Sequence, residues 1–104
     1  MPKQLVVTRY ADEDILNITS YLKQEWGNKV AENFLAELLD FYQLVELQPK
    51  SFSFYIKSKN IRKFSMKNVN LILYRLKKTK IEIIAVIDGR KQPSAIKKLT
   101  RSRL

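Results

Sequence analysis

The sequence predicts an α+β domain in which an N-terminal strand (residues 5–7) and a helical hairpin precede a three-stranded antiparallel meander, with both helices packed on one face of the sheet. Two observations lead to this prediction. Apolar residues recur at helical spacing up to Pro49, and from Ile61 onward they form runs rich in Ile, Val and Leu that are typical of strands. The 104 residues, 45% of them hydrophobic, suffice for one core and are too few for two. We therefore expect residues 1–104 to form a single domain, with residues 95–104 as a basic C-terminal tail.

Residues that favour helix boundaries mark the ends of the two predicted helices. Thr8, Asp12 or both offer side-chain oxygens that accept backbone N–H groups at a helix start. Gly27 is a natural end for this first helix, and Asn28 can cap the second. Pro49 cannot continue a helix and is expected to end the second one.

The apolar residues of both predicted helices share one face of each helix. In the first helix they are Ile15, Ile18, Leu22 and Trp26, and in the second they are Ala31, Phe34, Leu35, Leu38, Phe41, Tyr42 and Val45. We expect the Trp and Phe residues among them to pack in the core rather than to bind a ligand, because large aromatic side chains at this spacing supply buried area.

The second half of the chain predicts three strands joined as a meander. They cover residues 61–64, 69–77 and 81–88. A two-residue loop at Lys78 and Thr79 would pair Lys77 with Lys80 and place Arg75 opposite Glu82. The same register pairs three further sets of apolar residues, namely Leu73 with Ile84, Leu71 with Val86 and Ile72 with Ala85.

Both faces of the last two predicted strands are apolar in the middle, so both need a cover. The helical hairpin can cover one face. The other face requires the C-terminal segment, a loop or another protein. The tail therefore has two interpretations: a disordered basic arm, or an ordered strand or helix that covers this face through Ile96, Leu99 and Leu104.

Charge is distributed unevenly along the chain. The formal net charge is +10, yet residues 1–48 carry four basic and eight acidic residues, whereas residues 49–104 carry 16 basic residues against Glu82 and Asp88. Residues 49–81 contain no carboxylate that could neutralise their charge internally. This asymmetry favours a polyanionic partner, either nucleic acid or an acidic protein segment. The alternative is a solvated basic surface that maintains solubility.

The composition also excludes several kinds of chemistry. The absence of Cys and His removes disulfides, thiolate nucleophiles, imidazole acid–base catalysis and ordinary zinc sites. We expect neither a metal nor a cofactor. No apolar run approaches the roughly 20 residues of a membrane helix, and residues 1–3 lead into a strand rather than a signal peptide. We therefore expect a cytoplasmic protein with no membrane partner.

Two short motifs, one on the middle strand of the meander and one after its last strand, indicate a family. They are Leu73-Tyr74-Arg75 on the middle strand and Asp88-Gly89-Arg90-Lys91-Gln92-Pro93 after the final strand. With the order of elements, these motifs resemble the RelE/ParE superfamily of toxins from bacterial type II toxin–antitoxin modules. The resemblance covers nearly the whole chain. It implies a compact toxin that a cognate antitoxin neutralises by wrapping a flexible C-terminal segment around it, in a toxin–antitoxin hetero-oligomer.

The antitoxin segment is expected to be acidic or amphipathic. Such a segment could lie over an exposed face of the sheet or along the hairpin, where it would bury apolar side chains while its carboxylates meet the positive charge.

The superfamily divides by target. RelE-like members cleave messenger RNA on the ribosome, whereas ParE-like members lack that catalytic set and inhibit DNA gyrase. Cleavage by a ribose 2′-hydroxyl needs a base, an acid and cations around the phosphate. If the chain were a ribonuclease, its catalytic residues would be Lys57, Lys59, Arg62, Arg75 and Arg90. Tyr55, Tyr74, Glu82 and Asp88 are the further acid or base candidates after Pro49.

The tail favours the ParE-like branch. RelE-like members typically carry a Tyr or His close to the C-terminus, and residues 95–104 contain neither. The sequence therefore favours a toxin that inhibits DNA gyrase without enzymatic activity, with the ribosome-dependent ribonuclease as the alternative. A further alternative is a non-toxic basic module that binds nucleic acid and stacks bases on Tyr55 or Phe64.

Five basic residues are the candidates for binding the target or nucleic acid. They are Arg62, Lys63, Arg75, Arg90 and Lys91. We expect the three arginines to converge on one patch at the rim of the sheet. Each also has a structural alternative: Arg75 could pair with Glu82, Arg90 could pair with Asp88 or cap backbone carbonyls, and Arg62 could be a solvated strand residue.

Overall fold

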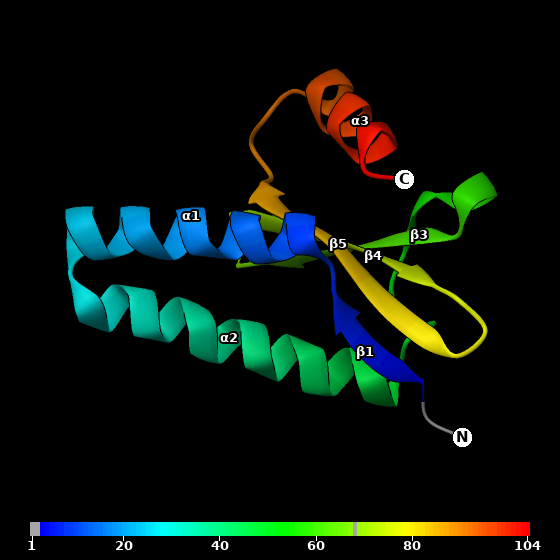
Figure 1. Cartoon of the computed structure of the whole chain (residues 1–104), viewed down its shortest axis with the longest axis horizontal. Coiled ribbons are helices and arrows are strands. Elements are labelled where there is room, and N and C mark those ends of the chain that lie inside the picture. Colours follow the sequence, from blue (N-terminus) through cyan, green and yellow to red (C-terminus); the bar gives the residue numbers. More distant parts are fainter. Residues whose placement is uncertain (1–2, 68) are drawn as a thin grey trace.

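Three helices and a five-stranded sheet form the computed structural model, which describes residues 3–67 and 69–104 (Figure 1). In chain order the elements are β1 (Gln4–Val7), α1 (Arg9–Trp26), α2 (Asn28–Leu47), β2 (Phe54–Ile56), the short 3₁₀ turn η1 (Lys57–Lys59), β3 (Ile61–Met66), β4 (Asn70–Leu76), β5 (Lys80–Asp88) and α3 (Pro93–Ser102). The predicted α+β class is confirmed. No helix among the described residues is both long and apolar enough to cross a membrane.

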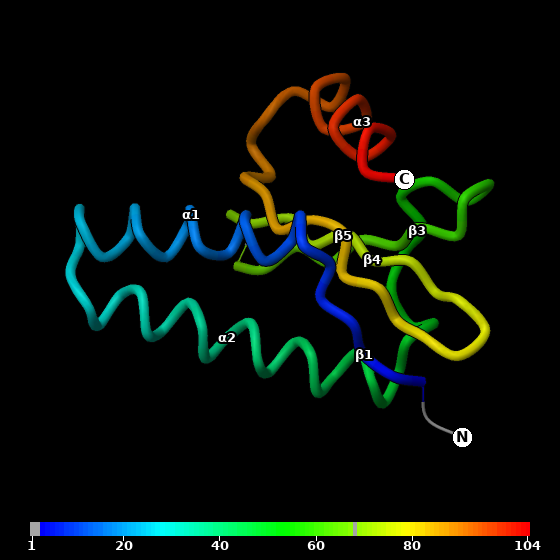
Figure 2. Tube along the Cα trace, in the orientation of Figure 1, coloured from blue at the N-terminus to red at the C-terminus, as the bar shows by residue number. Residues whose placement is uncertain are grey.

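The sheet has the strand order β1-β5-β4-β3-β2. The predicted meander of β3, β4 and β5 is confirmed, since both of its pairings are antiparallel. Two short strands extend it. The N-terminal strand β1 pairs in parallel with the start of β5, and β2, which the sequence analysis did not predict, pairs antiparallel with β3. Figure 2 shows the N-terminal β1 running beside the start of β5, at the opposite edge of the sheet from β2.

The predicted register of β4 and β5 is right near the turn and wrong beyond it. Arg75 pairs with Glu82 as expected, and Lys77 donates its backbone N–H to the carbonyl of Lys80 at 2.8 Å. The register then shifts between Leu73 and Tyr74. The observed pairs beyond the shift are Leu73 with Ala85, Ile72 with Val86 and Leu71 with Ile87, each displaced by one residue from the prediction.

The cause of this displacement is a β-bulge that inserts one extra residue into β5. Ile84 and its neighbour Ala85 consequently pack in the same hydrophobic cluster, on the face of the sheet away from α1 and α2. Regular alternation would have sent them to opposite faces.

The helix boundaries follow local chemistry. Thr8 is the N-cap of α1, where its hydroxyl accepts the backbone N–H of Ala11 and donates to the carbonyl of Ile83. Gly27 ends α1 with φ of 91°, a backbone conformation that residues other than glycine rarely adopt. The prediction that Asn28 caps the second helix is wrong. Gly27 also serves as the N-cap of α2, so that Asn28 is already its first residue.

The main core lies between the helical hairpin and one face of the sheet. Phe41 is 2% exposed and stacks on Phe64 with ring centroids 4.6 Å apart, while the ring of Tyr74 meets it edge-on at 6.0 Å. Phe34 is buried in the same cluster, as predicted. The prediction that Trp26 packs in the core is wrong, since this side chain is 67% exposed. Figure 1 gives the reason: the turn between α1 and α2 projects beyond the sheet.

The second face of the sheet is covered by α3. Ile96 is buried and Leu99 half-buried against Leu73, Ile84 and Ala85, while Leu104 remains 40% exposed. Of the two interpretations of the C-terminal tail, the ordered helix that covers the sheet is therefore right, and the disordered basic arm is wrong. Of the three side chains expected to make the cover, two do so.

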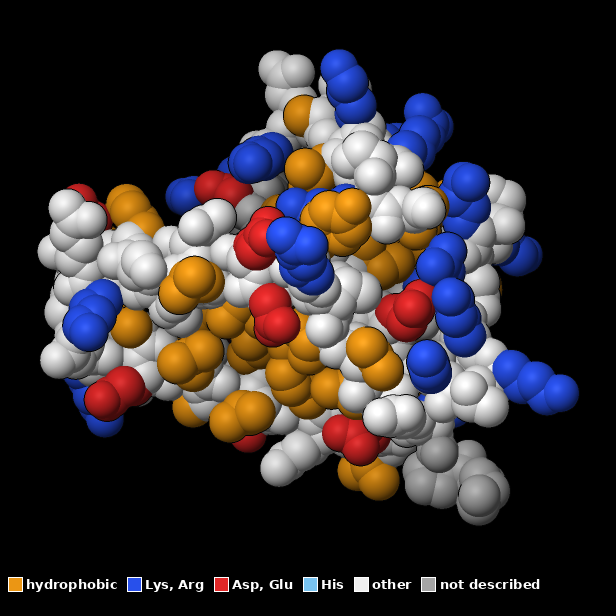
Figure 3. Space-filling model, viewed as in Figure 1, with side chains coloured by type: hydrophobic (Ala, Val, Ile, Leu, Met, Phe, Trp, Pro, Cys, Tyr) orange, Lys and Arg blue, Asp and Glu red, His pale blue; other side chains and the backbone are white. Residues whose placement is uncertain are grey.

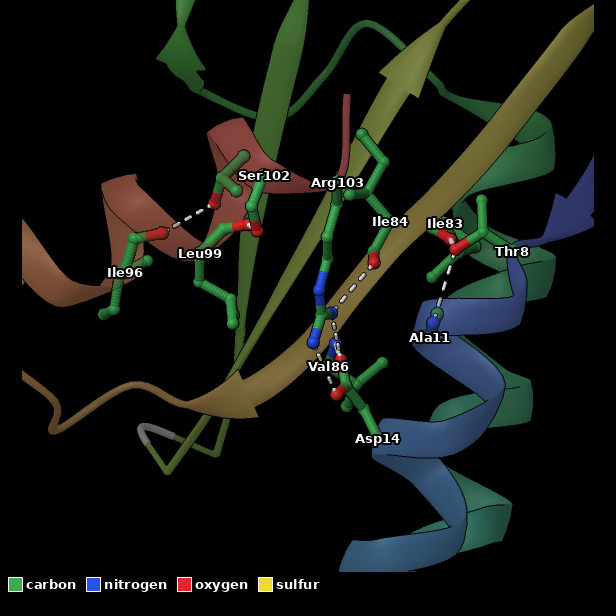
Figure 4. Close-up of polar contacts among 11 residues, drawn as sticks. Thr8, Ala11, Asp14, Ile83, Ile84, Val86, Ile96, Leu99, Ser102 and Arg103 are labelled. Carbon is green, nitrogen blue, oxygen red and sulfur yellow. Dashed lines mark hydrogen bonds and ion pairs between the residues drawn. The ribbon is translucent and has the colours of Figure 1, made fainter.

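A largely buried ion pair holds the end of α3 to α1 (Figure 4). Arg103 donates to both carboxylate oxygens of Asp14, at 2.6 and 3.0 Å, and the two side chains are only 11% and 13% exposed. Asp14 also accepts the backbone N–H of Val86 at 3.0 Å, and Arg103 donates to the carbonyl of Ile84 at 3.2 Å. Because β1 pairs with β5 only as far as Ile83, this ion pair occupies the edge of β5 where β1 stops.

Candidate functional site

Arg62 anchors a loop to the sheet. Its guanidinium donates to the carbonyl of Phe52 at 2.6 Å and to that of Lys50 at 3.2 Å, and it lies 4.0 Å from the ring centre of Phe54. Its Nε atom is buried and has no hydrogen-bond partner within the described part of the chain. The prediction of Arg62 as a solvated strand residue is therefore wrong. Its guanidinium is also not free to donate hydrogen bonds to a target, because it already donates to backbone carbonyls.

Arg75 forms the predicted cross-strand pair. Its guanidinium donates to one oxygen of Glu82 from two nitrogen atoms, at 3.1 and 3.2 Å, and the two side chains are 27% and 18% exposed. Lys77 shares the same oxygen at 3.5 Å. The charge of Arg75 is thus largely balanced by Glu82.

Arg90 pairs with Asp88, which is one of the structural roles that the sequence analysis offered for it. The contacts from its side chain to the two carboxylate oxygens measure 3.0 and 2.9 Å, and its backbone N–H donates to the same carboxylate. The hydrogen bonds from Arg90 lower the pKa of Asp88 from 3.8 to about 2. Asp88 is therefore fully ionised at neutral pH and unsuited to proton transfer there.

The expected convergence of the three arginines is wrong. Arg62 lies on the hairpin face of the sheet, in register with Tyr74, whereas Arg75 follows Leu73 on the opposite face. Arg90 lies just past Asp88. Asp88 is six residues along β5 from Glu82, the partner of Arg75, and six strand residues span about 20 Å. The alternation of side chains along the strands puts Arg62 and Arg75 on opposite faces of the sheet. The length of β5 separates Arg90 from Arg75.

The remaining predicted site residues are exposed lysines. Lys63 lies on β3, Lys91 follows β5, and Lys57 and Lys59 form the ends of η1. Lys57 lies 5.9 Å from the ring centre of Phe54. The geometry does not gather these lysines with Arg75 and Arg90 around one point.

The tyrosines that could serve as acid or base are tied up or buried. Tyr74 is fully buried, its hydroxyl donates to the carbonyl of Pro49 at 2.8 Å, and burial raises its pKa to about 12. Burial also raises the pKa of Tyr55. Both phenols are therefore protonated at neutral pH and cannot act as bases.

The helical hairpin carries an exposed apolar surface, at one of the two places where the sequence analysis expected an antitoxin segment to lie. Nine of its large hydrophobic side chains are exposed, and we call them the hairpin row: Tyr10, Leu16, Tyr21, Trp26, Val30, Leu35, Leu39, Leu44 and Leu47. Figure 3 shows hydrophobic side chains gathered over α1 and α2 on this side of the molecule. The available signal was a surplus of apolar residues, since Leu16, Leu39 and Leu47 fall outside the stripe assigned to the core.

Two grooves accompany the hairpin row. One, of about 420 Å³, lies between α1 and α2 and has Leu16, Ala31 and Leu35 among its lining residues. The other, of about 220 Å³, lies between α2 and β3 and is lined by Phe41, Leu44, Phe64 and Met66 together with Glu37, Asp40 and Lys67. Each offers a partner an apolar floor with charged side chains at its rim.

Comparison with known proteins places these features in a family context. A family model described as the ParE toxin of the type II toxin-antitoxin system parDE matches residues 5–93. Among solved structures, one described as the chromosomal ParDE TA system from P. aeruginosa has the same fold, with a TM-score of 0.72 and 15% sequence identity over 83% of this chain and 95% of that chain. No curated protein matches the chain.

Proposed function

Because the chain belongs to the ParE toxin family of type II toxin–antitoxin systems, we propose that it inhibits DNA gyrase and is neutralised by a cognate antitoxin. The observation that supports inhibition without catalysis is the pairing of the arginines. Arg62 binds backbone carbonyls, Arg75 binds Glu82 and Arg90 binds Asp88. A ribonuclease would need these cations free and close together around one phosphate.

The hairpin row supports neutralisation by a partner segment. Exposed apolar patches rimmed by polar residues are typical of protein interfaces. The groove between α1 and α2 is suited to an amphipathic segment whose apolar side chains enter beside Leu16 and Leu35. We therefore assign the antitoxin to the hairpin, since α3 already covers the second face of the sheet.

Charge refines the nature of this segment. Residues 9–47, which make up the hairpin, contain eight acidic residues against Arg9, Lys23 and Lys29. An acidic segment would be repelled along this surface, so we propose that the part bound to the hairpin is amphipathic and neutral or basic. Any acidic part of the antitoxin would have to lie against the second half of the chain.

The target is tested by two assays on one purified sample. The chain is added to DNA gyrase in a supercoiling assay, and to ribosomes carrying a defined messenger RNA. We expect loss of supercoiling and an intact message. Undiminished supercoiling would contradict the proposal, and so would cleavage of the message that disappears in a Lys57→Ala, Lys59→Ala double variant.

The antitoxin surface is tested by substitution in the groove. Leu16→Gln with Leu35→Gln should weaken binding of the protein encoded beside this chain and leave growth arrest on expression unrelieved by that protein. Val69→Gln with Leu104→Gln is the matched control, because both side chains are exposed hydrophobic residues outside the hairpin. Equal loss of rescue in the control would show that the groove is not the binding surface.

A further inference from the structure

A depression of about 430 Å³ at one end of the sheet gathers cations from four separate parts of the chain. Its lining residues are Lys3, Lys50, Asn60, Arg62, Leu76, Lys77 and Lys78. None of the lining residues that the structure describes carries a carboxylate. We call this region the basic end. Figure 3 shows blue side chains gathered along the corresponding edge of the molecule, near the turn between β4 and β5.

The backbone around the basic end is held by hydrogen bonds from its own side chains. Lys3 donates its ammonium group to the carbonyls of Lys77 and Lys78 in the turn between β4 and β5. Asn60 donates to the carbonyl of Leu76 at 2.7 Å. Arg62 holds the loop that carries Lys50 through its contact with the carbonyl of Lys50. The walls of the depression are therefore fixed before any ligand binds.

The positive charge of the basic end is only weakly neutralised from within. Among the described residues, the lining side chains form one ion pair, between Lys77 and Glu82. Glu82 is already paired with Arg75. The ammonium groups of Lys50 and Lys78 make no hydrogen bond or ion pair within the described part of the chain, and both side chains are exposed. Lys59 and Lys80 lie next to the depression along the chain and extend the same charge. The basic end therefore attracts a polyanion at contact distance.

We propose that the basic end binds the phosphate backbone of duplex DNA. The lining residues include one apolar side chain and no aromatic ring, so the site lacks the stacking surfaces that single-stranded nucleic acid requires. It also lacks the apolar anchors by which a protein segment would be held. A duplex presents the densest regular array of phosphates, about one charge per 1.7 Å of its axis, and exposed lysines on a fixed backbone can meet such an array without reading its sequence.

This inference goes beyond gyrase inhibition, because it concerns direct contact with DNA in the absence of any enzyme. Fluorescence anisotropy of a labelled 30-base-pair duplex is measured with the purified chain at several salt concentrations. The test variant carries Lys50→Gln and Lys78→Gln, and the matched control carries Lys97→Gln and Lys98→Gln on α3. Both variants lose two charges from exposed lysines, and circular dichroism verifies that both fold like the parent chain.

The expected result is a change in salt dependence confined to the test variant. Loss of two phosphate contacts lowers the slope of log K against log salt by about 1.8, which corresponds to affinity weakened about 60-fold at 0.1 M salt when the affinity at 1 M salt is unchanged. The control should retain the parent slope. Equal losses in both variants would overturn the proposal, since attraction would then depend on net charge alone.

Two further arms identify the ligand. A single-stranded RNA of equal charge should bind more weakly than the duplex, and poly-glutamate at the same charge concentration should not displace the duplex. Tighter binding of the RNA, or displacement by poly-glutamate, would overturn the assignment to duplex DNA. Because no gyrase is present, failure here would leave the proposed inhibition of gyrase untouched, and the supercoiling assay would leave this inference untouched.

Discussion

Replacing Arg103 should destabilise the whole domain, although this residue is the second to last in the chain. Arg103→Met removes one partner of an ion pair whose side chains are 11% and 13% exposed. The carboxylate of Asp14 then keeps only the backbone N–H of Val86, and the carbonyl of Ile84 loses its side-chain donor. Removing one member of a buried pair costs about 3–5 kcal/mol, and the residual exposure of this pair places the expected loss at the lower end, about 3 kcal/mol.

The expected loss is large enough to measure in a chain of this size. Domains are stable by about 5–15 kcal/mol, and for about 100 residues each kcal/mol shifts Tm by about 4–8 °C. Urea unfolding should therefore show a lower midpoint for Arg103→Met with an unchanged m value, and a Tm lower by about 12–24 °C. Arg9→Met is the matched control, because Arg9 pairs with Glu13 at the surface with 91% of its side chain exposed. It should unfold like the parent chain.

A double-mutant cycle tests the reasoning itself. Asp14→Ala alone leaves the Arg103 charge without its carboxylate, whereas Asp14→Ala with Arg103→Met leaves no unpaired charge. The double variant should therefore cost less than the sum of the two single variants, by about 0.5–3 kcal/mol. Strict additivity, or a loss below about 1 kcal/mol for Arg103→Met, would show that the pair does not hold the edge of β5.

Three further predictions concern single side chains. Tyr74→Phe removes the donor to the carbonyl of Pro49 and should cost about 1 kcal/mol in urea unfolding, whereas Tyr42→Phe should cost less, since the buried Tyr42 hydroxyl has no partner among the described residues. Gly27→Ala should destabilise by about 1 kcal/mol through backbone strain at φ of 91°, as measured by Tm, while Asn28→Ala should have a smaller effect. The pKa of Asp88 is lowered from 3.8 to about 2 in the folded chain, so its pairing stabilises above about pH 4 and this contribution is lost as pH falls toward 2. Urea midpoints between pH 2 and pH 6 should fall less steeply with acid in Arg90→Gln than in the parent chain.

The fold was predictable where the signal is local. Apolar spacing and the boundary residues Thr8, Gly27 and Pro49 locate the hairpin, and the aliphatic runs locate β3, β4 and β5. The bulge at Ile84 was not predictable, because regular alternation and the bulged register both place apolar residues on both faces. Side chains from distant elements satisfy the backbone beside the bulge: Asp14 binds Val86, and Arg103 binds Ile84. Neither contact was predicted from the sequence.

The candidate site was less predictable because it depends on which face of the sheet each strand side chain points to. A net positive half was evident from the sequence, but the direction of each cation follows from the register of β3 against β4. Arg62 pairs with Tyr74, so it faces the hairpin, and Arg75, one residue later on β4, faces α3. A prediction that joined these residues by type alone could not separate the two faces. The lysines that do come together include Lys3 and Lys50, which lie far apart in the sequence.

The two proposed surfaces lie on different elements and carry opposite charge. The hairpin row is apolar with acidic surroundings, and the basic end is formed by the first residues described, a loop and the turn between β4 and β5. An amphipathic segment bound beside Leu16 and Leu35 would therefore leave the basic end open unless a second, acidic part reached it. If neutralisation by the antitoxin abolishes DNA binding, that acidic part must exist. If DNA binding persists in the complex, neutralisation acts through the hairpin alone.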